Sequence, residues 1–133
     1  MIQRHLSKQR QIELGSFYTP NYLVDRMYSI IDTYLNKRDI DNKMVLFFDN
    51  ASGYGAFYRP ERNFLLADID EKAIEKIIHD FKIKNKKNLF ITNSLKEVSR
   101  SKYNINKDIF LINIGNPPYN DTTSIINSGK KGT

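Results

Sequence analysis

The chain has 133 residues, of which 40% are hydrophobic, and this is typical of one water-soluble domain with a single core. It has 21 Lys and Arg against 15 Asp and Glu, which gives a formal net charge of +6. It has no cysteine and two histidines, which excludes disulfides and thiolate metal sites and argues against a His-rich metal centre. No apolar run approaches the ~20 residues that span a bilayer, and the N-terminus lacks the apolar stretch of a secretory signal, so we expect a cytoplasmic protein without membrane contact. The basic surplus permits an anionic partner such as nucleic acid but does not require one.

Residues 1–13 are polar and mixed in charge, and we expect a flexible arm there. A helix is predicted from Pro20 to Asn36, because Thr19 suits the capping position and Pro20 suits the first helical position, where its missing N–H costs nothing. Five apolar side chains fall on one face at helical spacing and are predicted to pack on the core: Leu23, Met27, Ile30, Ile31 and Tyr34.

Four short apolar runs follow, and continuous runs of this length are typical of strands buried on both faces of a parallel sheet. They are Met44–Phe48, Phe64–Ala67, Leu89–Thr92 and Ile109–Ile114. A second, amphipathic helix is predicted from Asp70, its favoured cap, to Asn85, with an apolar face of Ile74, Ile77, Ile78 and Phe81. Strands separated by crossover connections predict an α/β fold with a parallel sheet and flanking helices.

Polar and glycine residues stand where these strands end. In parallel α/β sheets, ligands bind at the carboxyl ends of the strands. Here the four strands are followed by Asp49 with a glycine turn, by Asp68, by Asn93 and by a loop that begins at Asn116. This coincidence predicts a ligand site at that edge of the sheet.

The glycine turn runs from Asp49 through Gly53 to Gly55. Glycine accepts positive φ and lets the backbone approach a ligand closely, although an ordinary strand-to-helix turn gives the same pattern. Asp68 follows Asp49 close to the ~20-residue offset at which an acidic side chain binds ribose hydroxyls; the alternative is a solvated carboxylate or a helix cap. A third glycine is missing and Pro60 stops a long helix from following, which favours a nucleoside ligand over a dinucleotide.

The fourth predicted strand ends in Asn116-Pro117-Pro118-Tyr119. Two prolines fix the backbone, so the Asn side-chain oxygen and a main-chain carbonyl become two acceptors for one NH₂ group. Such acceptors favour a more tetrahedral nitrogen in a transition state, and Tyr119 is suited to stack on a planar base. The alternative is a plain turn at the end of an edge strand, with Tyr119 packed.

Four motifs occur in order along the chain: FYTP at 17–20, DNASGYGAF at 49–57, ADID at 67–70 and NPPY at 116–119. Over residues 14–121 they resemble the amino-terminal part of the N6-adenine DNA methyltransferases of restriction–modification systems. The resemblance implies a Rossmann-like methyltransferase fold that uses S-adenosylmethionine to methylate an adenine flipped out of double-stranded DNA.

The resemblance also implies roles for individual residues. The residues expected to bind the cofactor, the first three through its methionine part, are Tyr18, Thr19, Pro20, Asp49, Gly53, Gly55, Asp68, Ile69 and Asn93. Within this set Asp68 is expected to hold the ribose hydroxyls and Ile69 to pack on the adenine, while Asn93 stands where the family usually has Asp. The expected catalytic loop, with acceptors for the target amine and a stacking tyrosine, is Asn116, Pro117, Pro118 and Tyr119.

In that family three more strands and a target-recognition region follow the NPPY motif, whereas here residues 122–133 are expected to be a disordered tail. The resemblance therefore implies an incomplete sheet with an exposed fourth strand, which favours pairing with a second chain. We also expect a truncated enzyme with little or no turnover on its own.

Two other functions stay open. An NPPY loop serves the amide nitrogen of a protein glutamine equally well, although FYTP before the first strand favours the DNA class. The chain is alternatively a non-catalytic remnant that binds nucleic acid or a partner. The basic run at Lys82–Lys87 is interpreted as a solvated helix end rather than a DNA-backbone contact.

Overall fold

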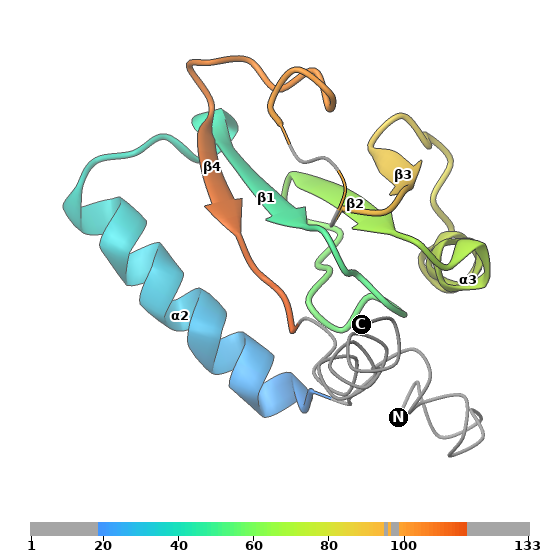
Figure 1. Ribbon diagram of the computed structural model, residues 1–133. Coiled ribbons are helices and arrows are strands. Elements are labelled where there is room, and N and C mark those ends of the chain that lie inside the picture. The colour runs from blue at the N-terminus through green and yellow to red at the C-terminus, as the bar shows by residue number, and fades with distance from the viewer. Residues whose placement is uncertain (1–18, 95, 97–98, 117–133) are drawn as a thin grey trace, which may run out of the picture.

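The computed structural model describes residues 19–94, 96 and 99–116, and the predicted arm and tail lie outside these ranges. The elements are the helices α2 (Asn21–Lys37) and α3 (Glu71–Phe81), the short 3₁₀ helix η2 (Asn42–Met44), and the strands β1 (Val45–Asp49), β2 (Phe64–Asp68), β3 (Leu89–Ile91) and β4 (Phe110–Asn113) (Figure 1). No helix in the described ranges has the length and apolar content needed to cross a membrane.

The four strands form one parallel sheet in the order β3-β2-β1-β4. This confirms the predicted α/β fold with a parallel sheet and flanking helices. β1 is central: Phe47 pairs with Phe64 of β2 on one side and with Ile112 of β4 on the other. Within the described ranges β4 pairs with β1 alone and is therefore an edge strand, as expected.

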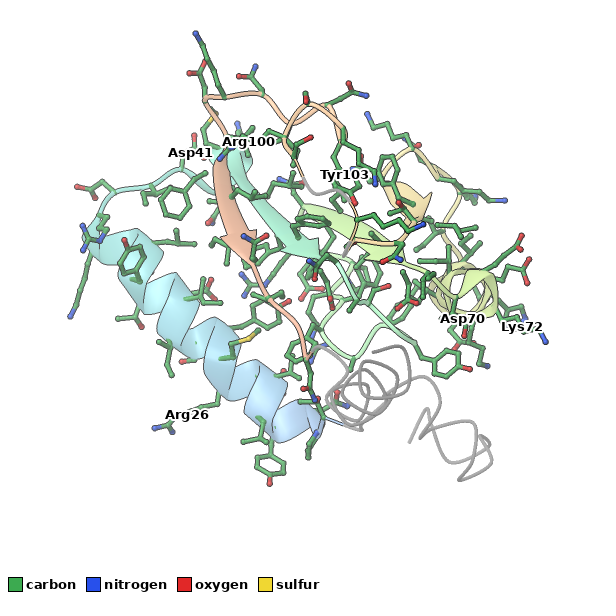
Figure 2. All side chains as sticks on the ribbon, viewed as in Figure 1. Arg26, Asp41, Asp70, Lys72, Arg100 and Tyr103 are labelled. Atoms are coloured by element: carbon green, nitrogen blue, oxygen red, sulfur yellow. The ribbon has the colours of Figure 1, made fainter. Side chains whose placement is uncertain are left out.

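The strands are apolar on both faces, because successive side chains point to opposite sides of a sheet. One face packs with both helices in a cluster of Val24, Tyr28, Leu35, Val45, Phe47, Phe57, Phe64, Leu66 and Ile77. The other face carries a smaller cluster of Phe48, Leu65, Ala67 and Tyr103. Tyr103 comes from the connection before β4, so a loop rather than a helix covers the centre of that face in the described chain (Figure 2).

Helix α2 differs from its prediction in two ways. Pro20, not Thr19, is its N-cap, with extended backbone at φ −61° and ψ 143°, and no side chain caps it. The buried side chains are Val24, Tyr28 and Leu35, whereas three of the predicted core residues are exposed, namely Leu23, Ile30 and Tyr34. The cause is tertiary: the Tyr28 hydroxyl donates to the Phe57 carbonyl, which turns this face toward the sheet.

Helix α3 begins as predicted and ends four residues early. Asp70 is its N-cap and accepts from the Lys72 N–H (Figure 2). The predicted end at Asn85 is wrong, because Lys82 adopts left-handed backbone with φ 53° and closes the helix at Phe81. The Ile83 N–H then donates to the Ile78 carbonyl and satisfies an orphan acceptor of the last turn.

Candidate functional site

The strand order defines where a ligand would bind. The chain winds from β1 through β2 to β3 on one side and returns to place β4 on the other side of β1. In open α/β sheets ligands bind outside the carboxyl ends of the strands where the winding direction changes. In this sheet that point lies between the end of β1 at Asp49 and the end of β4 at Asn113.

Asp49 is buried at this point with an exposed fraction of 1%. Its Oδ1 accepts from the Ala51 N–H at 3.2 Å. Among the described residues, neither its Oδ2 nor the buried hydroxyl of Ser52, three positions on, has a hydrogen-bond partner. Burial raises the pKa of Asp49 to about 7, the Ala51 N–H opposes the rise, and the negative charge of Asp68 adds to it. Near neutral pH this carboxyl is therefore poised between its two charge states.

Gly115 brings the end of β4 directly against Asp49. Its φ of +146° is rare for residues with a side chain, and a Cβ at this position would lie 2.7 Å from Asp49 Oδ1. Only glycine allows this approach. Sequence reasoning missed Gly115 as a site residue; the signal was a glycine placed directly before Asn116.

Asp68 ends β2 and holds the glycine turn in place. Its Oδ2 accepts from the Gly53 N–H at 2.7 Å and its Oδ1 from the Asp70 N–H at 2.8 Å. Burial raises its pKa, and these two N–H groups oppose the rise. A carboxylate oxygen has a second acceptor position, so Asp68 keeps capacity for ribose hydroxyls. Ile69 follows it and is 65% exposed, as a side chain available to a ligand must be.

The two glycines of the turn have different surroundings. Gly53 has φ +54° and open space where a Cβ would be. Gly55 is buried, with Ile77 Cγ1 and Phe81 Cε2 at 3.2 and 3.3 Å from the position of a Cβ. The structure thus explains Gly55 by packing under α3, and its role beside a cofactor stays a prediction.

One residue of the first motif and one residue of the last motif meet at this edge. Asn116 Nδ2 donates to Thr19 Oγ1 at 3.2 Å, across 97 positions of sequence. The contact leaves the Asn116 carbonyl oxygen as the acceptor end of the amide. Tyr18 and the rest of the predicted catalytic loop, Pro117, Pro118 and Tyr119, lie outside the described residues.

The end of β3 joins the same edge. The Thr92 N–H donates to the Asp68 carbonyl, and the Ser94 hydroxyl donates to the Asn50 carbonyl in the glycine turn. Asn93, between them, is half-buried and also has an interaction partner. The structure therefore brings the predicted residues of β1, β2 and β3 into contact through backbone groups, and those of β4 through Asp49.

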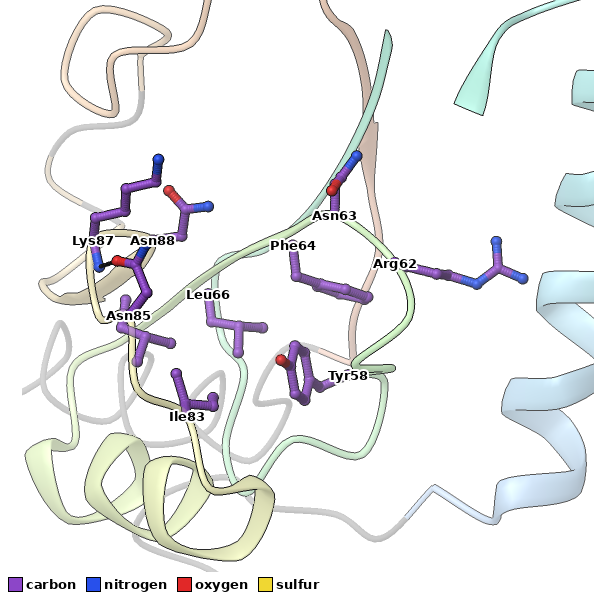
Figure 3. Close-up of a pocket in the computed structure, with 10 residues that line it drawn as sticks. Tyr58, Arg62, Asn63, Phe64, Leu66, Ile83, Asn85, Lys87 and Asn88 are labelled. Atoms are coloured by element: carbon purple, nitrogen blue, oxygen red, sulfur yellow. Dashed lines mark hydrogen bonds between the residues drawn. The ribbon is translucent and has the colours of Figure 1, made fainter. Parts of the chain in front are cut away.

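Three surface pockets lie away from this edge. One of about 200 Å³ is formed at the amino ends of β2 and β3 by Tyr58, Phe64, Leu66, Ile83 and Leu89, with a polar rim that includes Lys87 (Figure 3). Two more, of about 440 and 510 Å³, lie between α2 and the β1–β2 connection around Arg62. Arg62 is held there by two hydrogen bonds to Asp32. None of the three pockets is lined by a residue at the carboxyl end of a strand.

No protein-family model, curated protein or solved structure matches this chain. In the described ranges no group of three or more His, Asp and Glu side chains is placed to hold a metal ion. The geometry and chemistry of the strand ends are therefore the basis for a functional proposal.

Proposed function

We propose that the chain is the cofactor-binding part of an S-adenosylmethionine-dependent methyltransferase of Rossmann-like fold, and that its target is the N6 amine of adenine in double-stranded DNA. The strand order supports the fold, because 3-2-1-4 is the order in which the first four strands of nucleotide-binding doubly wound sheets lie. The four motifs supply the reaction class by resemblance.

One observation carries the proposal: the hydrogen bond between Thr19 and Asn116. This bond joins one residue of the FYTP motif to one residue of the NPPY motif, close to Asp49, and so supports a shared site. Neither motif is specific alone, since Thr-Pro and Asn-Pro-Pro are common in turns. The bond joins two polar side chains 97 positions apart in sequence, at the edge of the sheet where ligands bind in α/β folds.

The residues at this edge fit an adenosyl ligand. Asp68 retains acceptor positions for ribose hydroxyls, and the exposed Ile69 offers an apolar surface to a purine. Asp49 Oδ2 is an acceptor that no residue of the described ranges uses. When bound, S-adenosylmethionine supplies an electrophilic methyl group on a sulfonium.

Asn116 would act on the amine that receives the methyl group. An exocyclic amine is a weak nucleophile because its lone pair is delocalised into the ring. The Asn116 side-chain oxygen, fixed through the opposite end of its amide by Thr19, accepts one N–H and favours the tetrahedral nitrogen of the transition state. Preorganised acceptors of this kind act where charge develops, so their effect is on the rate rather than on substrate binding.

Two measurements on the full chain test the proposal. Calorimetric titration with S-adenosylmethionine should show one binding site. Any labelled methyl group that the chain transfers to double-stranded DNA, even at a very low rate, should be recovered as N6-methyladenine after nucleoside digestion. Asn116→Ala should abolish transfer and retain cofactor binding, whereas Asn36→Ala on the exposed end of α2 should change neither. Absence of cofactor binding, or label found on glutamine of added protein instead of on DNA, would contradict the proposal.

A further inference from the structure

The pocket at the amino ends of β2 and β3 has walls suited to one planar ring system. Phe64 and Leu66 line it from the core, and the half-buried Tyr58 and Ile83 line it nearer the surface. The Tyr58 ring is fixed by edge-on contacts to Phe64 and Phe81, with centroid distances of 5.3 and 4.8 Å. The volume of about 200 Å³ is below the ~300–1,000 Å³ of pockets for drug-sized ligands, so the pocket suits a single ring system rather than a whole cofactor.

The rim of this pocket offers both hydrogen-bond donors and acceptors. Asn85 Oδ1 accepts from the Lys87 N–H at 3.1 Å, which leaves the Asn85 NH₂ group as a donor. Asn63 Nδ2 donates to the Val45 carbonyl at 3.4 Å, which leaves the Asn63 side-chain oxygen as an acceptor. Asn88 adds a third, exposed amide. A nucleobase edge carries donors and acceptors side by side and matches such a rim, whereas a hydrocarbon ring or a plain carboxylate does not.

The Tyr58 hydroxyl adds a polar group inside the pocket. It points toward the side chains of Leu66 and Ile83 (Figure 3). Burial raises the pKa of Tyr58 and the negative charge of Glu61 adds to the rise, so the hydroxyl keeps its proton near neutral pH. A neutral hydroxyl both donates and accepts, so it suits the edge of a base.

The rim is also positively charged. Lys87 lines the pocket, and Lys84 and Lys86 lie in the same exposed segment. In the described part of the chain none of these three lysines has an ion-pair partner. Arg62 does not add to this charge, because its guanidinium turns away from the pocket and binds Asp32 (Figure 3). The charge favours a ligand that carries an anionic group beside its ring.

We propose that this pocket binds the base of a nucleotide and that the phosphate of this nucleotide lies against Lys87. The base packs on the fixed Tyr58 ring, and its edge meets the amides of the rim. The pocket lies at the amino ends of the strands, so it is separate from the proposed cofactor site and does not depend on the proposed function. A free nucleotide and a single strand of nucleic acid both supply this chemistry.

Amide NMR titrations of the full chain test the proposal. The probes are adenosine and cytidine 5′-monophosphates, the corresponding nucleosides, and ribose 5-phosphate, which lacks a base. We expect at least one monophosphate to shift the amide signals of residues 83–89 and ribose 5-phosphate to leave them in place. Affinities are taken from these signals, so a nucleotide bound at the carboxyl ends of the strands does not enter the comparison.

Three variants separate the phosphate contact from the base contact. Lys87→Gln should weaken the monophosphate about fivefold and leave its nucleoside unchanged. Tyr58→Phe keeps the ring and should weaken monophosphate and nucleoside alike, by about threefold to fivefold. Lys72→Gln is the matched control, because it removes the same charge from an exposed position at the other end of α3, and it should change neither affinity.

A short single-stranded DNA distinguishes the two sources of the nucleotide. Binding at least about fivefold tighter than the monophosphate identifies a strand, because further phosphates then reach Lys84 and Lys86, and weaker binding identifies a free nucleotide; both support the proposal. Unmoved signals at residues 83–89 with both monophosphates, equal weakening by Lys87→Gln and Lys72→Gln, or equal binding of ribose 5-phosphate would each overturn it. Failure of S-adenosylmethionine to bind would overturn the proposed function and leave this site standing.

Discussion

Gly115 illustrates how a single missing side chain shapes the candidate site. A Cβ there would lie 2.7 Å from Asp49 Oδ1, and the backbone is at φ +146°. We expect Gly115→Ala to lower the free energy of unfolding by ~2–3 kcal/mol, because steric overlap adds to backbone strain. Gly53→Ala is the control: it meets no atom within 4 Å and should cost only the left-handed backbone penalty of ~1 kcal/mol. Equal losses in urea unfolding would show that the contact with Asp49 is unimportant.

Thr19 has a role that its sequence position does not indicate. It was predicted as a helix cap, yet its hydroxyl accepts from Asn116. We expect Thr19→Val to lower kcat for methyl transfer about fivefold, the equivalent of the ~1 kcal/mol contributed by a neutral hydrogen bond, with KM for DNA unchanged. Thr19→Ser keeps the hydroxyl and should restore kcat. A loss that Ser fails to restore would assign Thr19 to packing instead.

At the scale of elements, Arg62 fixes helix α2 on the sheet. Its guanidinium binds Asp32 through two hydrogen bonds of 2.9 and 2.8 Å and lies 4.2 Å from the centre of the Tyr28 ring. Arg62→Lys loses the bidentate geometry and the stacking, and should lower the free energy of unfolding by ~1–2 kcal/mol. Arg26→Lys is the control, because Arg26 is exposed on the same helix, and it should change this free energy by less than ~0.5 kcal/mol. Urea unfolding followed by circular dichroism measures both, and similar losses would contradict the assignment.

Helix α2 also shows why sequence patterns gave the element but not its orientation. The helix carries two adjacent apolar stripes, one with Val24 and Tyr28 and one with Leu23 and Ile30. Helical periodicity accepts either stripe as the core face. The choice depends on partners more than 20 residues away, Phe57 and Arg62, which a local pattern does not contain. The cap of α3 was predictable, because Asp70 bonds only two positions ahead.

For the whole molecule, the sequence predicted the strands and their parallel arrangement, since each apolar run is local and crossovers impose the direction. Contacts between strand ends were harder to predict from the sequence. The approach of Gly115 to Asp49, for example, depends on the register between β1 and β4. The position of β4 at the edge of the sheet was predictable, and the exposed apolar side chains of α2 add to the apolar surface of the molecule. Asp25 and Asp32 contact the β1–β2 connection, so by helical geometry the exposed Leu23, Ile30 and Tyr34 lie on the opposite flank of α2.

The free energy of unfolding should depend on pH in a way that reflects the raised pKa of Asp49. Because burial raises its pKa to about 7 in the folded chain from 3.8, the folded state binds the extra proton between these values. The carboxyl group therefore costs nothing in charge burial below about pH 4, and its destabilising effect grows between about pH 4 and pH 7 and levels off above pH 7. We expect Asp49→Asn to increase the free energy of unfolding at pH 8 relative to pH 5 by ~2–3 kcal/mol when each is compared with the native chain.

Asp68, whose pKa burial also raises, contributes in the same pH window, but the native chain and Asp49→Asn share that contribution. Hydrogen bonds from Arg62 and from Lys76 lower the pKa values of Asp32 and Asp80, so their contributions change only below about pH 4. Urea unfolding of the native chain, Asp49→Asn and Asp39→Asn at pH 5, 6.5 and 8 separates the effects, because Asp39 is exposed and its variant should follow the native chain at every pH. A constant difference between the native chain and Asp49→Asn would mean that Asp49 is ionised throughout. The oxygen of Asp49 that lacks a partner in the described ranges would then have to be satisfied by water.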